Sequence, residues 1–239
     1  MTRARDTSAF TLVEMLLVVA IIVILLGMLL PQFKKPTDNV CANNLRIIYQ
    51  ATVIYAAANA RYFPPARQGD TNDPGWVQTP WHDINAVRNG VLYSYMGGNE
   101  KAYVCPVFES VFKFRNPGHA NKTPAFTYSL SEYTGRSWQG KAGIRTFSGE
   151  VKTAEFGLYS DENAWIVTGQ SAHEINNGAM GVGAYGNVAS IVDAIGSFHQ
   201  PIDDNLDNGY ANVVFVDGHV NLHHITESKE VMTPTRYKN

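Results

Sequence analysis

An apolar run over residues 15–30 constrains this chain more than any other feature. The run holds sixteen residues without a polar side chain, and residues 10–13 extend it to about twenty, with Glu14 as the interruption. At about 1.5 Å per residue, a helix of this length spans a bilayer core. Arg3 and Arg5 precede it, so the positive-inside tendency predicts a cytoplasmic N-terminus and a chain that continues outside.

The carboxylate of Glu14 separates three interpretations of this segment. A cleaved secretory signal would have a shorter apolar region and a small-residue cleavage site, and no such pattern follows residue 30. A plain single-pass anchor explains the length but not the acidic residue, since a charge at mid-helix costs about 2.5–3.5 kcal/mol on insertion scales. A carboxylate in the first turns of a helix is favoured by free backbone N–H groups and the helix dipole.

The sequence Ala9-Phe10-Thr11-Leu12-Val13-Glu14, after a short basic leader, resembles the processing signal of type IV prepilins and type II secretion pseudopilins. The resemblance implies that a prepilin peptidase cuts between Ala9 and Phe10 and methylates the new amine of Phe10. Ala9 stands where the family usually has glycine. The resemblance also implies that Glu14 pairs with the terminal amine of a neighbouring subunit and so sets the filament register.

Pro31 lies where many pilins carry a helix-bending proline, and a proline inside a helix removes one hydrogen bond. The alternative is that the membrane helix ends here. The predicted organisation is a leader over residues 1–9, a transmembrane helix over 10–31, an extracytoplasmic continuation of the helix over 32–62, and a globular domain over 63–239. The net charge of −2 gives no sign of nucleic-acid binding.

Beyond the apolar segment, the pattern predicts an α+β fold with an antiparallel sheet. Residues 38–60 have the periodicity of a helix. Its expected apolar face consists of Val40, Ile47, Ala51, Ile54 and Ala58. Turn signals over 66–100 indicate a loop-rich excursion. Short strands are expected at 101–106, 126–130, 155–160 and 164–168, and the clearest element is a hairpin of 211–216 and 219–223 around Asp217-Gly218.

This hairpin resembles the C-terminus of a large bacterial group of pilin-like proteins, whose signature is a histidine, nine residues and then Asp-Gly. Residues 41–46, 62–65 and 104–106 also resemble patterns of that group. Here Asp207 occupies the histidine's place, and the nearest upstream histidine is His199. Either the intervening loop has grown by about eight residues, or the role of the histidine is lost.

Three further sets of residues suggest sites. Cys41 and Cys105 would lie outside the cytoplasm, where a disulfide can persist; the alternative is two separate buried thiols. Alternating oxygens of Asp203, Asn205 and Asp207 are reminiscent of a calcium loop, and the alternative is a solvated turn. His219, His223 and His224 are predicted to be ordinary strand histidines, because two of them on one face of a strand lie about 13 Å apart.

The function expected from these features is structural, not enzymatic. The chain would be a pilin or pseudopilin of a type IV pilus or a type II secretion pseudopilus, with prepilin peptidase, sister subunits and the inner membrane as partners. The alternative is a membrane-tethered binding module, for example for carbohydrate, whose candidate aromatic residues are Trp76, Trp81, Trp138 and Trp165.

Overall fold

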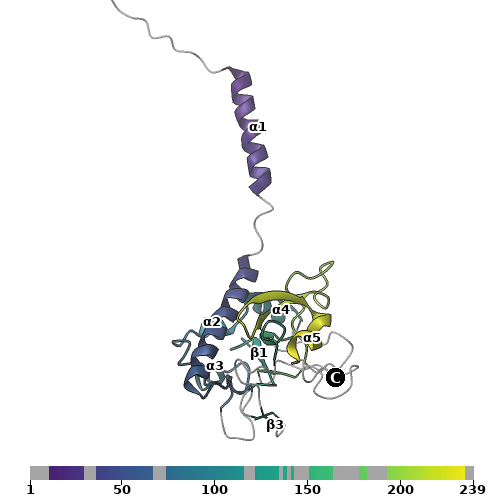
Figure 1. Cartoon of the computed structure of the whole chain (residues 1–239). Coiled ribbons are helices and arrows are strands. Elements are labelled where there is room, and N and C mark those ends of the chain that lie inside the picture. The colour runs from purple at the N-terminus through teal and green to yellow at the C-terminus, as the bar shows by residue number, and fades with distance from the viewer. Residues whose placement is uncertain are drawn as a thin grey trace, which may run out of the picture. The chain divides into compact units, whose positions relative to one another are not determined.

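The computed structural model describes residues 11–29, 36–66, 74–115, 122–134, 137–138, 141–142, 151–163, 178–181 and 193–234. The chain divides into two compact units, residues 1–36 and residues 37–239. The first unit contains helix α1 (Leu12–Leu29), and the second contains the remaining helices and all the strands described (Figure 1).

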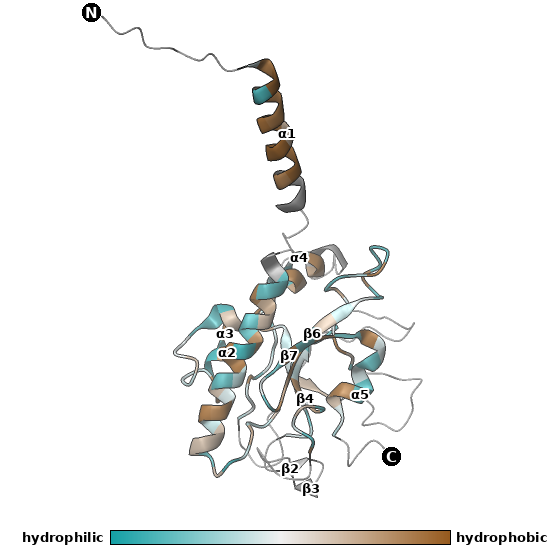
Figure 2. Ribbon diagram, turned by 45° about the horizontal axis from the view of Figure 1, so that its top comes forward, coloured by the Kyte–Doolittle hydropathy of each residue, from teal (hydrophilic) through white to brown (hydrophobic). Residues whose placement is uncertain are grey.

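Helix α1 is apolar around its whole circumference apart from one polar position near its start (Figure 2). Its side chains from Leu12 to Leu25 are exposed within this single chain. Among the helices of the described residues, none combines the length and the apolar character needed to cross a membrane. The ends of the predicted 10–31 segment lie outside the described residues.

Helix α2 (Pro36–Ala58) follows the prediction in position but not in the face that it buries. Val40 and Ile54 are about half exposed. The buried face consists of Cys41, Asn44, Leu45, Ile48, Ala51, Thr52 and Ala56. The predicted face was therefore wrong for Val40, Ile54 and Ala58, although Ala51 is buried and Ile47 packs against the core. The buried face is rotated from the predicted one because it includes polar residues whose hydrogen bonds are satisfied. Asn44 Nδ2 donates to the Val104 carbonyl at 3.0 Å, and Thr52 Oγ1 donates to the Ile48 carbonyl at 2.9 Å.

The middle of the chain contains short helices in place of the first predicted strand. Residues 101–106 form the end of the 3-10 helix η2 (Glu100–Tyr103) and the start of α4 (Pro106–Arg115). A proline is favoured at the first helical position, since its missing N–H would have no partner there. The loop-rich excursion is confirmed over its described part, where α3 (Ile84–Arg88) is the single α-helix.

Five strands form the main sheet in the order β5-β1-β4-β6-β7. They are β1 (Tyr128–Ser131), β4 (Gly157–Asp161), β5 (Ala179–Met180), β6 (Tyr210–Phe215) and β7 (Val220–His224), and a separate ribbon joins β2 (Ser137–Trp138) to β3 (Lys141–Ala142). The sheet is mixed, not purely antiparallel as predicted, because β5 pairs parallel with β1. A parallel pair requires a long connection, so its direction leaves no local mark in the sequence. The strand predicted at 164–168 lies outside the described residues.

The C-terminal hairpin lies where the sequence predicts it, with β6 and β7 joined by residues 216–219. Gly218 has a φ of +90°, which favours glycine, and a Cβ placed there would lie 2.5 Å from Cε1 of Tyr49. Tyr49 belongs to α2, and its hydroxyl donates to the Val216 carbonyl at 3.0 Å. The Asp-Gly turn is therefore a packing surface for α2 as well as a reversal of the chain. Two short helices follow the hairpin, the 3-10 helix η4 (Ile225–Glu227) and α5 (Ser228–Met232).

Candidate functional site: the N-terminal segment and a buried histidine

The start of α1 is organised by Thr11 and Glu14. The Thr11 backbone N–H and Oγ1 both donate to Glu14 Oε2, at 2.9 and 2.8 Å, and the Glu14 backbone N–H approaches Thr11 Oγ1 at 3.3 Å. This reciprocal pattern is a capping box, which satisfies backbone N–H groups left free at a helix start. The Thr-x-x-Glu spacing of residues 11–14 is the sequence signature of this box, whereas the sequence predictions gave Glu14 no partner within its own chain.

The other residues of the predicted processing signal are not placed. Ala9, Phe10 and Pro31 lie outside the described residues. Cleavage, methylation and the helix kink at these positions therefore stay predictions.

In the second unit, Cys41 and Cys105 form a disulfide with a Cα–Cα distance of 5.1 Å. Cys41 lies on the buried face of α2, and Cys105 directly precedes α4. The bridge thus joins α2 to the start of α4, between cysteines that are 64 residues apart in the sequence. The sequence left the pairing open, because spacing alone does not show that two cysteines meet.

His199 lies beside this disulfide and is completely buried. Its Nδ1 lies 2.9 Å from Asp38 Oδ1, and its Nε2 lies 3.0 Å from Asp161 Oδ2. Nε2 also lies 3.5 Å from Cys105 Sγ and 3.4 Å from Asn212 Nδ2. Four segments that are remote in the sequence therefore meet at one imidazole.

Two carboxylates determine the charge of His199. Burial by itself lowers the pKa of the imidazole, but hydrogen bonds and attraction from Asp161 and Asp38 outweigh burial and raise the pKa to about 9. The imidazole is therefore protonated at neutral pH, with one N–H directed at each carboxylate. Burial raises the pKa of Asp161, while His199 and the Asn212 backbone N–H act in the opposite direction. Its Oδ1 is buried and forms no hydrogen bond of standard length and angle within the described residues.

The backbone of His199 pairs with that of Tyr210 at the start of β6. His199 and Tyr210 form an antiparallel bridge, in which each backbone N–H donates to the other's carbonyl at 3.0 and 2.8 Å. Residues 200–209 form a loop that leaves from this bridge and returns to it. The polar partners Asp38 and Asp161 carry no sequence signal, because they are far from His199 along the chain.

The candidate calcium residues lie in this same loop. Asp203 and Asn205 are exposed, Asp207 is partly buried, and Asn205 Oδ1 accepts a hydrogen bond from the Asp207 backbone N–H at 3.0 Å. Among the described histidine, cysteine, aspartate and glutamate residues, the group whose ligand atoms could hold one metal ion is Cys41, Cys105 and His199. A calcium role for the loop stays a prediction.

The candidate carbohydrate-binding tryptophans do not form an exposed platform where they are described. Trp76 is fully buried, stacks on Tyr103 at a centroid distance of 5.8 Å, and donates from Nε1 to the Gly178 carbonyl at 2.6 Å. Trp81 is 3% exposed. These two rings are core residues and give no support to the alternative of a carbohydrate-binding module. The side chains of Trp138 and Trp165 lie outside the described residues.

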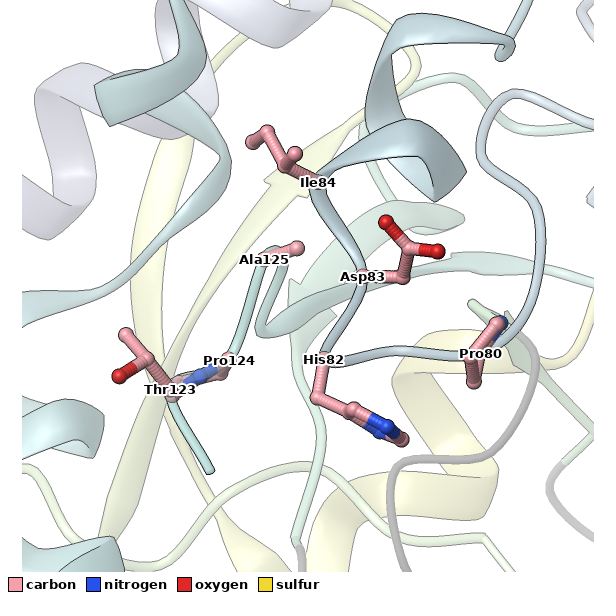
Figure 3. A pocket seen from close by; sticks show the side chains of 7 residues that line it. All are labelled: Pro80, His82, Asp83, Ile84, Thr123, Pro124 and Ala125. Carbon is pink, nitrogen blue, oxygen red and sulfur yellow. The ribbon is translucent and has the colours of Figure 1, made fainter. Parts of the chain in front are cut away.

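A cavity of about 500 Å³ lies between residues 80–84 and 123–125 (Figure 3). Its polar side chains are His82, Asp83 and Thr123, and the imidazole of His82 is directed away from the carboxylate of Asp83 (Figure 3). Asp83 Oδ1 already accepts the Asn85 backbone N–H at 2.9 Å as the N-cap of α3. The lining therefore does not assemble an acid, base and nucleophile.

Comparison with known proteins identifies the N-terminal segment. Residues 5–30 match the prokaryotic N-terminal methylation motif. The chain therefore carries a prepilin-type signal, which implies processing by prepilin peptidase and export to the inner membrane or beyond it. No curated protein and no solved structure shows a significant match to the chain.

Proposed function

We propose that this protein is a structural subunit, a pilin or pseudopilin, of a type IV pilus or a type II secretion pseudopilus. The observation that carries the proposal is the methylation motif over residues 5–30, which coincides with a helix that is apolar on every side and exposed in the single chain. Such a helix needs an apolar environment on all sides, from lipid or from other helices. The proposed role requires no catalytic residues.

Before assembly, the apolar segment would hold the protein in the inner membrane. If residues 10–31 were helical throughout, they would reach about 33 Å, close to the thickness of a bilayer core. Prepilin peptidase would cut before Phe10 on the cytoplasmic side. Head-to-tail contacts that do not close into a ring would then build the filament.

Glu14 has two possible partners in this scheme. Within its own chain it caps α1 through Thr11. Within the filament it would pair with the methylated amine of a neighbouring Phe10. Opposite charges attract far more strongly in an apolar layer than in water. Because a carboxylate has two oxygens and several acceptor positions, Glu14 can cap the helix and still accept from the neighbouring amine.

The exposed apolar side chains of α2 fit contacts between subunits. Val40 and Ile54 are 46% and 56% exposed, and Ile47 between them is partly buried. The spacing of seven residues places the three on one side of a helix. We assign this face to contact with the apolar face of a second copy of the chain.

The position of His199 supports the resemblance to the group with the histidine and Asp-Gly signature. Seventeen residues separate His199 from Asp217, eight more than in the signature. The loop over 200–209 has ten residues, and its ends are already bridged by His199 and Tyr210. Without eight of them, a two-residue hairpin would remain, which is a common connection between antiparallel strands. This geometry favours a grown loop over a lost histidine.

The test of the assembly role uses two variants of Glu14. Glu14→Ala removes both the cap and the charge, whereas Glu14→Gln keeps an acceptor for the capping box and removes the charge alone. If Glu14 acts through pairing with an amine, both variants should stay in the membrane fraction and be absent from sheared filaments. The measurement is the fraction of the protein in each pool.

The matched control is Thr11→Ala, which weakens the cap and leaves the carboxylate in place. This variant should assemble better than either Glu14 variant. Normal incorporation of Glu14→Gln would contradict the pairing. Mass spectrometry of the mature N-terminus tests processing separately: a methylated Phe10 is expected, and an uncut chain would instead favour a tethered ectodomain.

A further inference from the structure

We propose that the dithiol form of this protein binds one Zn²⁺ ion through Cys41, Cys105, His199 and Asp161. The two sulfur atoms and one imidazole nitrogen all lie within 4.8 Å of one another, and all three side chains are completely buried. In the disulfide form the sulfurs are bonded to each other. In the dithiol form the same sulfur atoms are free to bind a metal ion together with His199. The disulfide and the metal-bound form therefore cannot exist at the same time.

Asp161 would supply the fourth ligand through a small movement of its carboxylate, which adjoins the group of Cys41, Cys105 and His199 without belonging to it. Its side chain is fully buried, Oδ2 lies 3.0 Å from His199 Nε2, and Oδ1 closes no hydrogen bond within the described part of the chain. The Asn212 backbone N–H stabilises this carboxylate without forming a hydrogen bond of standard length and angle, so Oδ1 keeps acceptor capacity for a metal ion. Two thiolates, one imidazole and one carboxylate make a four-ligand set of the types that Zn²⁺ accepts in tetrahedral sites.

Asp38 would orient the imidazole. Its Oδ1 lies 2.9 Å from His199 Nδ1, on the side of the ring away from Nε2. Histidine ligands of metals commonly donate their second N–H to a carboxylate, which fixes the tautomer and the direction of the ring. Here that arrangement directs Nε2 toward Cys105 Sγ at 3.5 Å and toward Asp161. The amide of Asn212, 3.4 Å from Nε2, would have to turn away from a bound ion.

The chemistry of the change is a thiol–disulfide exchange followed by metal binding. A dithiol reductant transfers two electrons and two protons to the Cys41–Cys105 bond and becomes a disulfide itself. Binding of Zn²⁺ then displaces the two thiol protons and the proton on His199 Nε2, while Nδ1 keeps its proton for Asp38. The thiols are also free before the bridge first forms, so the ion could hold α2 and the start of α4 together at that stage.

The experiment uses the full chain in detergent and Co²⁺ as a spectroscopic substitute for Zn²⁺. Reduced protein, freed of reductant without air, should take up one equivalent of Co²⁺ and show thiolate-to-cobalt charge-transfer absorption with the visible bands of a tetrahedral ion. Zn²⁺ should abolish both signals. The disulfide form should show neither. No absorption by the reduced protein, or equal absorption by both forms, would overturn the proposal.

Variants separate a built site from chance binding by loose thiols. Asp38→Asn should weaken Co²⁺ affinity by about 10- to 100-fold, as loss of a supporting carboxylate does elsewhere. Asp161→Asn should change the visible bands as well as the affinity. His223→Ala, outside the cluster, is the matched control and should bind as the unaltered protein does. Unchanged affinity in both aspartate variants would contradict the assigned ligands.

Folding of the reduced chain gives a second readout. Zn²⁺ should raise the thermal unfolding midpoint of the reduced protein and leave that of the disulfide form unchanged. If the reduced chain folds only with Zn²⁺, the same site is supported, since metal binding and folding are then coupled. A reduced chain that stays unfolded with Zn²⁺ present would count against it. None of these results depends on filament assembly.

Discussion

At the residue scale, single side chains connect elements that are remote in the sequence. The ring of Tyr49 on α2 packs against Gly218 in the C-terminal turn. The two ring nitrogens of His199 form hydrogen bonds with Asp38 and Asp161. The first contact depends on the absence of a Cβ atom at Gly218, and the second depends on the two ring nitrogens of His199. The effects of substitution should therefore be large and local.

Gly218→Ala should lower the free energy of unfolding by about 2–4 kcal/mol. The methyl group would meet Tyr49 Cε1 at 2.5 Å in a backbone conformation with φ of +90° that disfavours alanine. Urea denaturation of the purified protein measures the loss. Gly97→Ala is the control for the backbone alone, since its φ is +62° and nothing lies within 4 Å of the added atom. Equal losses in the two variants would argue against the contact with Tyr49.

Buried tyrosines predict how stability depends on alkaline pH. Tyr159 is fully buried, its hydroxyl lies 2.8 Å from Thr52 Oγ1, and burial raises its pKa above the usual value of about 10. The unfolded chain therefore loses this proton first as the pH rises. Its contribution to stability is complete below pH of about 9 and falls above about 10, by about 1.4 kcal/mol per pH unit.

Tyr159→Phe removes this titrating group and should make the loss of stability above pH of about 10 shallower by that amount. Tyr128→Phe, at a second fully buried ring whose pKa burial also raises, should do the same. Urea denaturation at a series of alkaline pH values measures both slopes. A slope unchanged in either variant would show that its ring titrates alike in the folded and unfolded chains.

At the scale of the elements, two faces of α2 differ in burial. Its buried face packs in the core and carries Cys41, which ties it to the start of α4. Its other side exposes Val40 and Ile54. The first side concerns stability, and the second is assigned to assembly, so substitutions on the two sides should have different effects.

Removal of the disulfide should destabilise the domain without changing its fold. Cys41→Ala with Cys105→Ala opens a loop of 64 residues, and the entropy gained by the unfolded chain corresponds to about 4 kcal/mol. Denaturation in the presence of a metal chelator measures the change. A loss below about 1 kcal/mol would indicate that the bridge hardly constrains the unfolded chain.

Val40→Lys and Ile54→Lys test the outward side of α2. Surface substitutions of this kind usually change the free energy of unfolding by no more than about 0.5 kcal/mol. Both should nevertheless reduce incorporation into filaments, because a charge would enter an apolar contact. Asn43→Lys, at an exposed polar position of the same helix, is the matched control. Assembly of all three variants to the same extent would refute the assigned contact.

At the scale of the whole molecule, the proposal that the loop over 200–209 is an addition implies that the fold closes without it. Its ends are joined by the bridge between His199 and Tyr210, and its side chains Asp203 and Asn205 face solvent. The loop does make some contacts with the fold, since Ser197 Oγ donates to the Leu206 carbonyl and Leu206 packs against the core. The surrounding sheet, not the loop, holds His199 in place.

Deletion of residues 201–208, with Gln200→Asn, should therefore leave the fold and the disulfide intact. The Asn-Gly pair that remains suits a two-residue hairpin, and the shorter connection offsets the lost contacts of Leu206. The expected change in the free energy of unfolding is within about 2 kcal/mol. Circular dichroism and denaturation measure it, and a chain that no longer folds would show that the loop is an integral part of the domain.

The sequence by itself determined the prepilin-type signal, the apolar helix, the position of α2 and the C-terminal hairpin. These features depend on neighbours within a few residues, whose spacing is written directly in the chain. Only the tertiary structure decided the buried face of α2, the parallel partner of β1 and the meeting of Asp38, Asp161 and His199 beside the disulfide. Their contacts join residues tens to more than a hundred positions apart, and such distances are set by how the elements pack, not by any local pattern.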